Sequence, residues 1–190
     1  MENSPEEGEG ADGIMEFIYG KQDFCNLERG EENCWLMTNG LGGFSSLTMT
    51  GSCNRNDQAV LMSCERDEAP NHRWNMIHRL EEVLIIGKKE LHISSQDFVE
   101  HERQERGWQY LTSFVYEDYP RWNYAAEGVE IQKTMALMPG ENTVGISYEI
   151  RNRSGEKAVL KVTPHLQFVP KGASPEKEQT FEISREEGVI

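Results

Sequence analysis

Short β-prone segments separated by turn-forming residues run along most of this chain, and this repetition constrains the fold more than any other feature. The segments are rich in β-branched, aromatic or alternating apolar residues, and the connections carry glycine, proline, asparagine and charged residues. No segment has a convincing pattern for a long helix. Because many short antiparallel strands are typical of a β-sandwich, the predicted fold class is all-β, with two facing antiparallel sheets. The expected strands cover residues 14–20, 35–38, 44–50, 57–64, 74–86, 90–93, 108–117, 121–126, 130–137, 143–152, 157–168 and 179–184.

A cluster of glycines interrupts two of these segments. Asn39 and Gly40 favour a tight hairpin turn, because both residues tolerate a positive φ. Gly42 and Gly43 follow at once, so the backbone either turns sharply or approaches another group closely. A dinucleotide-binding loop would continue through a third glycine position, occupied here by Ser45, into a helix. We therefore interpret Asn39, Gly40, Gly42 and Gly43 as a structural turn between strands.

The charge balance limits the partners that the chain can bind. The sequence has 19 basic and 33 acidic residues, a formal net charge of −14. Nucleic-acid binding needs a cationic surface, so no nucleic-acid partner is expected, whereas a neutral sugar polymer is compatible with this charge. No apolar run reaches the length of a membrane span, and no membrane partner is expected either.

The N-terminal residues are acidic and poor in apolar side chains. A secretory signal would instead be basic and then apolar. We therefore expect a disordered acidic leader over residues 1–13, a β-domain over residues 14–190 and a cytoplasmic location.

The cysteines give no sign of a metal or redox site. They form no Cys-x-x-Cys pair and have no histidine at zinc-finger spacing. A free cysteine in strand-like sequence behaves as a small apolar residue. We expect buried thiols with no metal and no cofactor, and a metal or redox site is the less favoured alternative. The cysteines are Cys25, Cys34, Cys53 and Cys64.

Two groups of residues are candidates for contact with a sugar. Two aromatic pairs, Trp108 with Tyr110 and Trp122 with Tyr124, have the i, i+2 spacing that places each pair on one face of its expected strand. Their rings could stack on sugars, but packing in the core is the favoured interpretation.

Loop residues are the stronger candidates, because binding groups concentrate in loops. His72, Arg73 and Trp74 follow a proline-containing loop. Arg55 and Asp57 follow the glycine turn, where they either orient sugar hydroxyls or form an ordinary ion pair at the end of a strand.

Several segments taken together resemble a known family. Residues 35–46 read Trp-Leu-Met-Thr-Asn-Gly-Leu-Gly-Gly-Phe-Ser-Ser. This run is similar to the signature that opens the N-terminal domain of bacterial and archaeal glycogen debranching enzymes, the amylo-α-1,6-glucosidases. The resemblance extends over roughly residues 17–168. Further landmarks match in order at residues 79–82, 107–111, 119–122, 128–134 and 140–143.

The resemblance implies a large sandwich of the supersandwich type, followed by a catalytic α/α barrel beyond residue 190. Hydrolysis of an α-1,6 branch needs two positioned carboxyl groups, and the resemblance implies that both lie in the barrel. The expected function is therefore that of a non-catalytic domain of glycogen breakdown. It would support the barrel of the same chain and also contact an α-glucan. A sandwich deprived of its barrel would expose an apolar face, which predicts self-association of the isolated domain.

Two other classes of function stay open at this point. One is a free-standing carbohydrate-binding module, and the other is an intact small hydrolase. The length of the chain leaves no room for the usual barrel of such a hydrolase.

Overall fold

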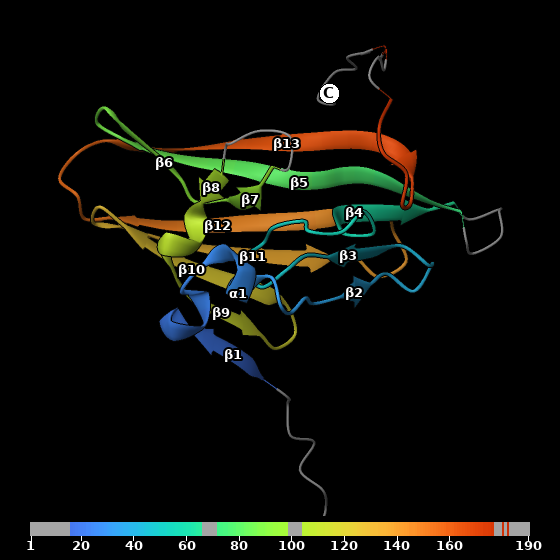
Figure 1. Cartoon of the computed structure of the whole chain (residues 1–190), viewed down its shortest axis with the longest axis horizontal. Coiled ribbons are helices and arrows are strands. Elements are labelled where there is room, and N and C mark those ends of the chain that lie inside the picture. Colours follow the sequence, from blue (N-terminus) through green and yellow to red (C-terminus); the bar gives the residue numbers. More distant parts are fainter. Residues whose placement is uncertain (1–15, 66–71, 99–103, 177–179, 181, 183–190) are drawn as a thin grey trace, which may run out of the picture.

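The computed structural model describes residues 16–65, 72–98, 104–176, 180 and 182. In this part of the chain two antiparallel sheets lie face to face, and the helical segments are single turns (Figure 1). This arrangement confirms the predicted all-β sandwich. The expected leader at residues 1–13 and most of the expected strand at residues 179–184 lie outside the described residues. None of the described helical segments has the length and apolarity to cross a membrane.

One sheet has five strands in the order β1-β9-β10-β11-β12, and all neighbours are antiparallel. In β11 every second residue is buried, as expected for a strand with one face on the core. β12 forms one edge of this sheet. The strands are β1 (Phe17–Gly20), β9 (Leu111–Tyr116), β10 (Pro120–Ala126), β11 (Val129–Leu137) and β12 (Val144–Asn152).

The second sheet has the order β13-β5-β4-β3-β2, and β6 pairs with the second half of β5 as a hairpin. Its neighbours are also antiparallel. β4 is buried on both faces, in agreement with its continuous apolar sequence. The strands are β2 (Met37–Thr38), β3 (Phe44–Ser46), β4 (Ala59–Cys64), β5 (Arg73–Ile86), β6 (Lys89–His92) and β13 (Ala158–Pro170).

Small elements outside the two sheets differ from the sequence-based expectation. Residues 21–33, which contain none of the expected strands, form two single helical turns, and two short strands that the sequence did not reveal pair with each other at residues 95–97 and 104–106. The single turns are η1 (Lys21–Phe24), α1 (Leu27–Gly30) and η2 (Gly107–Gln109), and the hairpin consists of β7 (Ser95–Asp97) and β8 (Gln104–Arg106).

The prediction that Trp108 and Tyr110 share one face of a strand is wrong. Trp108 lies in η2, and β9 begins only at Leu111. Gly107 explains the difference, because a Cβ on this residue would lie 2.0 Å from the carbonyl oxygen of Ile93. The chain therefore passes through a tight contact before the strand starts.

The core lies between the sheets and is rich in aromatic rings. Trp122 is fully buried, and its ring centroid lies 5.2 Å from that of Phe114 and 5.7 Å from that of Trp35. Its indole nitrogen donates to the carbonyl oxygen of Met49 at 2.9 Å. Tyr124 is also buried. The core interpretation of Trp122 and Tyr124 is thus confirmed.

The cysteines divide into two classes. Cys53 and Cys64 are buried free thiols, as expected, and burial raises the pKa of Cys53 to about 12. Cys25 and Cys34 are free but exposed, so the expectation of burial is wrong for these two. Both lie in the irregular N-terminal region outside the paired strands.

The glycine turn connects β2 and β3 and also contacts the opposite sheet. The Asn39 side chain accepts from the amide of Leu41, and its Nδ2 donates to the Glu141 carbonyl at 2.9 Å and to Asn142 Oδ1 at 3.0 Å. Asn142 in turn bonds both the amide and the carbonyl of Cys64. The turn of the six-stranded sheet is therefore held against the β11–β12 loop of the five-stranded sheet.

Candidate functional site

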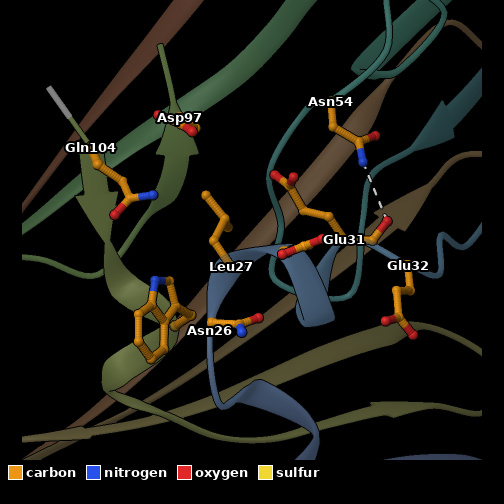
Figure 2. Close-up of a pocket in the computed structure, with 9 residues that line it drawn as sticks. Asn26, Leu27, Glu31, Glu32, Asn54, Asp97 and Gln104 are labelled. Atoms are coloured by element: carbon orange, nitrogen blue, oxygen red, sulfur yellow. Dashed lines mark hydrogen bonds between the residues drawn. The ribbon is translucent and has the colours of Figure 1, made fainter. Parts of the chain in front are cut away.

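A cleft of about 610 Å³ opens beside α1 and the β7–β8 hairpin (Figure 2). Its lining combines carboxylates, side-chain amides and one tryptophan, which come from four separate parts of the chain. The lining residues are Asn26, Leu27, Glu28, Glu31, Glu32, Asn54, Asp97, Gln104 and Trp108.

The single turn α1 supplies one wall of the cleft. Asn26 caps it, because its Oδ1 accepts from the amide of Arg29 at 2.7 Å. Leu27 is buried under the turn and anchors it to the body of the domain. The turn thereby holds Glu28, Glu31 and Glu32 at the rim.

Glu31 is the most constrained carboxylate of the cleft. Its Oε1 accepts from Ser52 Oγ at 2.6 Å, and Ser52 is itself bonded to the buried hydroxyls of Thr48 and Thr50. Asn54 Nδ2 donates to the backbone carbonyl of Glu31 at 3.3 Å. Burial raises the pKa of Glu31, the Ser52 hydrogen bond opposes that rise, and the negative charge of Asp97 adds to it.

The β7–β8 hairpin and η2 form the opposite wall. Asp97 and Gln104 are paired across the hairpin, so their side chains lie side by side (Figure 2). Trp108 follows in η2, which Lys21 secures by donating to the carbonyls of Trp108 at 3.3 Å and Leu111 at 3.1 Å. The Trp108 side chain is half-buried, and its indole nitrogen is buried without a hydrogen-bond partner among the described residues. The part of Trp108 that the cleft can offer to a ligand is therefore its ring.

The predicted candidates Arg55 and Asp57 do not line the cleft, although they follow Asn54 directly. Arg55 Nε lies 3.9 Å from Asp57 Oδ1, and both side chains are more than half exposed. Arg55 Nη2 also contacts Cys34 Sγ at 3.0 Å. The pair has the geometry of a surface ion pair.

The candidates His72, Arg73 and Trp74 lie at the start of β5, beside the glycine turn. Arg73 Nε donates to the carbonyl oxygen of Gly42 at 2.6 Å, and its guanidinium lies 5.9 Å from the ring centre of Phe44. His72 is exposed and Trp74 is half-buried. The structure therefore places the five predicted site residues in two groups, and neither group lines the Trp108 cleft.

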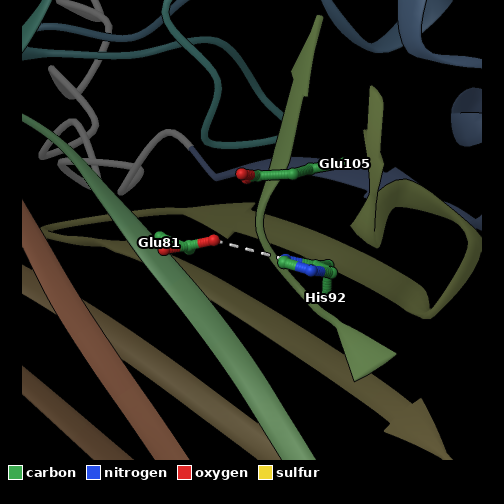
Figure 3. A group of neighbouring side chains, drawn as sticks. All are labelled: Glu81, His92 and Glu105. Carbon is green, nitrogen blue, oxygen red and sulfur yellow. Dashed lines mark ion pairs between the residues drawn. The ribbon is translucent and has the colours of Figure 1, made fainter. Parts of the chain in front are cut away.

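One group of side chains could in principle hold a metal ion. Ligand atoms of Glu81, His92 and Glu105 all lie within 4.8 Å of one another (Figure 3). However, Arg79 already occupies both oxygens of Glu105, at 2.8 and 3.0 Å, and Ser94 Oγ donates to the same carboxylate.

The positive charge of Arg79 beside Glu105 favours an ion-pair network over a metal site at these side chains. Burial alone would raise the pKa of Glu105, because it disfavours the charged carboxylate. The hydrogen bonds and positive charge of Arg79 have the larger effect, so the pKa of Glu105 lies below its ordinary value. A cation at Glu105 would also meet the buried guanidinium of Arg79. The donor set therefore fits a metal ion poorly.

Sequence reasoning named Trp108 among the aromatic residues that could contact a sugar, but it favoured core packing for this residue and missed the residues around it. Asn26, Glu31, Asp97 and Gln104 stand in polar segments that resemble ordinary loops. No local pattern indicates that segments so far apart in the chain form one cleft.

The comparisons with known proteins agree with the fold. The family model described as "Glycogen debranching enzyme N terminal" matches residues 33–190. A local similarity to the membrane protein insertase YidC of Thiobacillus denitrificans covers 60 residues at 37% identity, which is 32% of this chain and 11% of that protein. No solved structure matches the chain. Since the family model spans most of the chain, the chain belongs to the glycogen debranching enzyme N-terminal family.

Proposed function

We propose that this chain is a non-catalytic N-terminal domain of a glycogen debranching enzyme, an amylo-α-1,6-glucosidase of glycogen breakdown. In this proposal the domain supports a catalytic barrel of the same polypeptide and binds α-glucan in the Trp108 cleft. Membership of the glycogen debranching enzyme N-terminal family supports the proposal that the full-length protein is a debranching enzyme. The single structural observation that carries the glucan contact is the half-buried ring of Trp108 beside carboxylates and amides in an open cleft.

The cleft offers the groups that a sugar chain requires. A pyranose presents apolar C–H faces, which pack on an aromatic ring, and hydroxyls that both donate and accept. Trp108 supplies the ring, Asp97 supplies acceptors, and Gln104 and Asn54 supply both kinds of group. A neutral glucan also avoids the repulsion that an anionic ligand would meet from a net charge of −14.

One observation favours a second candidate function, a hydrolase that acts without a barrel. Glu31 has a raised pKa and lies near Asp97, as a general acid and its partner carboxylate would. The hydrogen bond from Ser52 ties Glu31 to a buried hydroxyl cluster, which favours a structural role. We therefore expect the purified chain to release no glucose from branched dextrin. Release that is abolished by Glu31→Gln would support the second candidate instead.

The glucan contact can be tested by affinity electrophoresis in gels that contain glycogen. Trp108→Ala should remove most of the retardation, because it removes the stacking surface. Trp74→Ala is the matched control, since Trp74 is also half-buried but lies outside the cleft. Retardation that is lost with Trp74→Ala and kept with Trp108→Ala would place the contact at His72, Arg73 and Trp74 instead. The thermal stability of both variants shows whether each is folded.

The proposed setting is the cytoplasm, where glycogen is degraded. The alternative of a free-standing carbohydrate-binding module can be separated from this proposal by the coding sequence that follows residue 190. A long series of paired helices there would support a barrel, and a stop codon would support the free-standing module.

A further inference from the structure

Two cationic side chains gather at one end of the six-stranded sheet, outside the Trp108 cleft. Arg73 begins β5 and Lys171 follows the end of β13, and these two strand ends lie side by side (Figure 1). The guanidinium carbon of Arg73 lies 5.9 Å from the ring centre of Phe44, and the Lys171 ammonium lies 5.5 Å from the same centre. We call Arg73 and Lys171 the cation pair.

The backbone holds the cation pair in adjacent positions. The amide of Lys171 donates to the carbonyl of Arg73 at 2.8 Å. The chain then turns at Gly172, which has a φ of +82°, and the Ala173 amide donates to the Pro170 carbonyl at 3.0 Å. The backbone of Lys171 is thus fixed beside Arg73, while its side chain is exposed.

The Arg73 guanidinium is oriented through one of its three nitrogens. Nε donates to the carbonyl oxygen of Gly42 at 2.6 Å. A guanidinium carries five N–H groups, so four remain on Nη1 and Nη2. These four N–H groups have no hydrogen-bond acceptor among the residues that the structure describes. They are therefore available to an acceptor from outside the chain.

Neither member of the cation pair meets a carboxylate in the described part of the chain. By contrast, Arg79 and Lys133 each lie 2.8 Å from a buried carboxylate oxygen. Two like charges beside one ring repel each other, and this repulsion is unusual in a chain with a net charge of −14. A bound anion would compensate both charges at once.

The chemistry of the cation pair fits a phosphate group. The planar guanidinium presents parallel N–H groups that match two phosphate oxygens, and the lysine ammonium acts as a compact point charge. A phosphomonoester carries a charge of about −1.5 to −2 at neutral pH, which balances two cations. A carboxylate carries a single negative charge and balances only one of them.

We propose that Arg73 and Lys171 bind the phosphate group of inorganic phosphate or of a small phosphomonoester. The Nη groups of Arg73 donate to two phosphate oxygens, and the ammonium of Lys171 donates to a third. The Phe44 ring positions both cations, because each packs against its π-electron surface. This site does not depend on the glucan contact at Trp108.

Nuclear magnetic resonance of the nitrogen-15-labelled chain tests the site. Phosphate is added up to about 20 mM at neutral pH and constant ionic strength, a range that covers millimolar affinity. We expect saturable shifts of the Arg73 Nε–H signal and of the Lys171 amide signal. A second titration with glucose 6-phosphate separates the two sources. An equal Kd would show that the phosphate group alone is recognised, and a lower Kd would show that the sugar also contributes.

Three charge-removing variants locate the binding groups. Arg73→Gln should raise the Kd for phosphate by about tenfold or more, because it removes the charged fork. Lys171→Gln should raise it by about threefold, as expected for an exposed charge, and keeps the test valid if Arg73→Gln unfolds. The control Lys161→Gln removes the same charge from the opposite half of β13, beside Val83, and should change the Kd by less than about twofold.

Three outcomes would overturn the proposal. The first is an unmodified chain whose Arg73 and Lys171 signals show no saturable shift with phosphate. The second is an equal increase in Kd for Lys161→Gln and Lys171→Gln, which would reflect the net charge of the chain instead of a site. The third is an acetate titration, at the same ionic strength, with a Kd equal to or lower than that of phosphate, which would show that the cation pair selects carboxylates.

Discussion

Asn39 joins the two sheets through hydrogen bonds of both its side chain and its backbone. Its side chain is 2% exposed and forms hydrogen bonds within its own turn and with the β11–β12 loop. Its backbone carbonyl also accepts from the amide of Gly140 at 2.8 Å. The Asn39 side chain leaves no room for a side chain on Gly43. A Cβ on Gly43 would lie 2.6 Å from Asn39 Nδ2 and 3.0 Å from the carbonyl oxygen of Met62.

Gly43→Ala should therefore destabilise the domain. The added methyl group meets a backbone atom that cannot move freely, so we expect a loss of about 1–3 kcal/mol in the free energy of unfolding, measured by urea denaturation. Gly145→Ala is the control, because its Cβ would meet nothing closer than the Ala136 carbonyl at 4.0 Å. This control should change stability by less than about 0.5 kcal/mol. Equal losses in both variants would contradict the role of the close contact.

Glu31 and Glu105 should affect stability with opposite dependence on pH. Burial raises the folded pKa of Glu31, so its contribution is present below its ordinary pKa of 4.5 and is lost as the pH rises through the folded value. The Arg79 interactions outweigh burial and lower the folded pKa of Glu105, so its contribution is present above 4.5 and is lost as the pH falls.

Urea midpoints measured between about pH 4 and pH 8 check this difference. The free energy of unfolding of Glu31→Gln, minus that of the unmodified chain, should increase as the pH rises. Glu105→Gln should lose stability over the same range. Parallel curves for the two variants would show that the assigned pKa directions are wrong.

At the scale of elements, β5 and β11 are joined across the core by an ion pair that is almost fully buried. Lys133 Nζ lies 2.8 Å from Glu82 Oε1, and each side chain is 3% exposed. The Lys133 ammonium also lies 5.1 Å from the ring centre of Trp122. Each charge is tolerated in the core because the other compensates it.

Lys133→Met should cost about 3–5 kcal/mol in the free energy of unfolding, because it leaves the Glu82 carboxylate buried without a cation. In Glu82→Gln/Lys133→Met the amide oxygen can still accept from Tyr148 and no buried charge remains. The double variant should therefore recover more than half of the loss in a denaturant titration. A double variant as unstable as the single one would contradict this account of the pair.

The long strands could be predicted from sequence, but the small elements could not. β4, β5, β10 and β11 follow from apolar runs or alternation and from the turn residues between them. The β7–β8 hairpin has strands of only three residues, which are too short to show a pattern. Tertiary contacts fix these short elements.

At the scale of the whole molecule, the fold was predictable and the assembled cleft was not. Trp108 could be identified as an aromatic candidate, but its partners come from the α1 turn, the loop at Asn54 and the β7–β8 hairpin. Their proximity depends on how these segments pack against the sheets. The loop candidates Arg55 and His72 instead lie outside the cleft, because position in a loop does not determine which loops meet.

The central claim, that α-glucan binds at Trp108, can be tested most directly by nuclear magnetic resonance of the indole N–H groups during titration with maltoheptaose. The chain has four tryptophans, and Trp→Phe variants assign each signal. We predict a saturable shift of the Trp108 signal. The Trp122 signal should stay constant, because its whole ring is buried in the core, away from the cleft, and its N–H is bonded to Met49. A shift of Trp74 without a shift of Trp108, or four unchanged signals at saturating glucan, would contradict the claim.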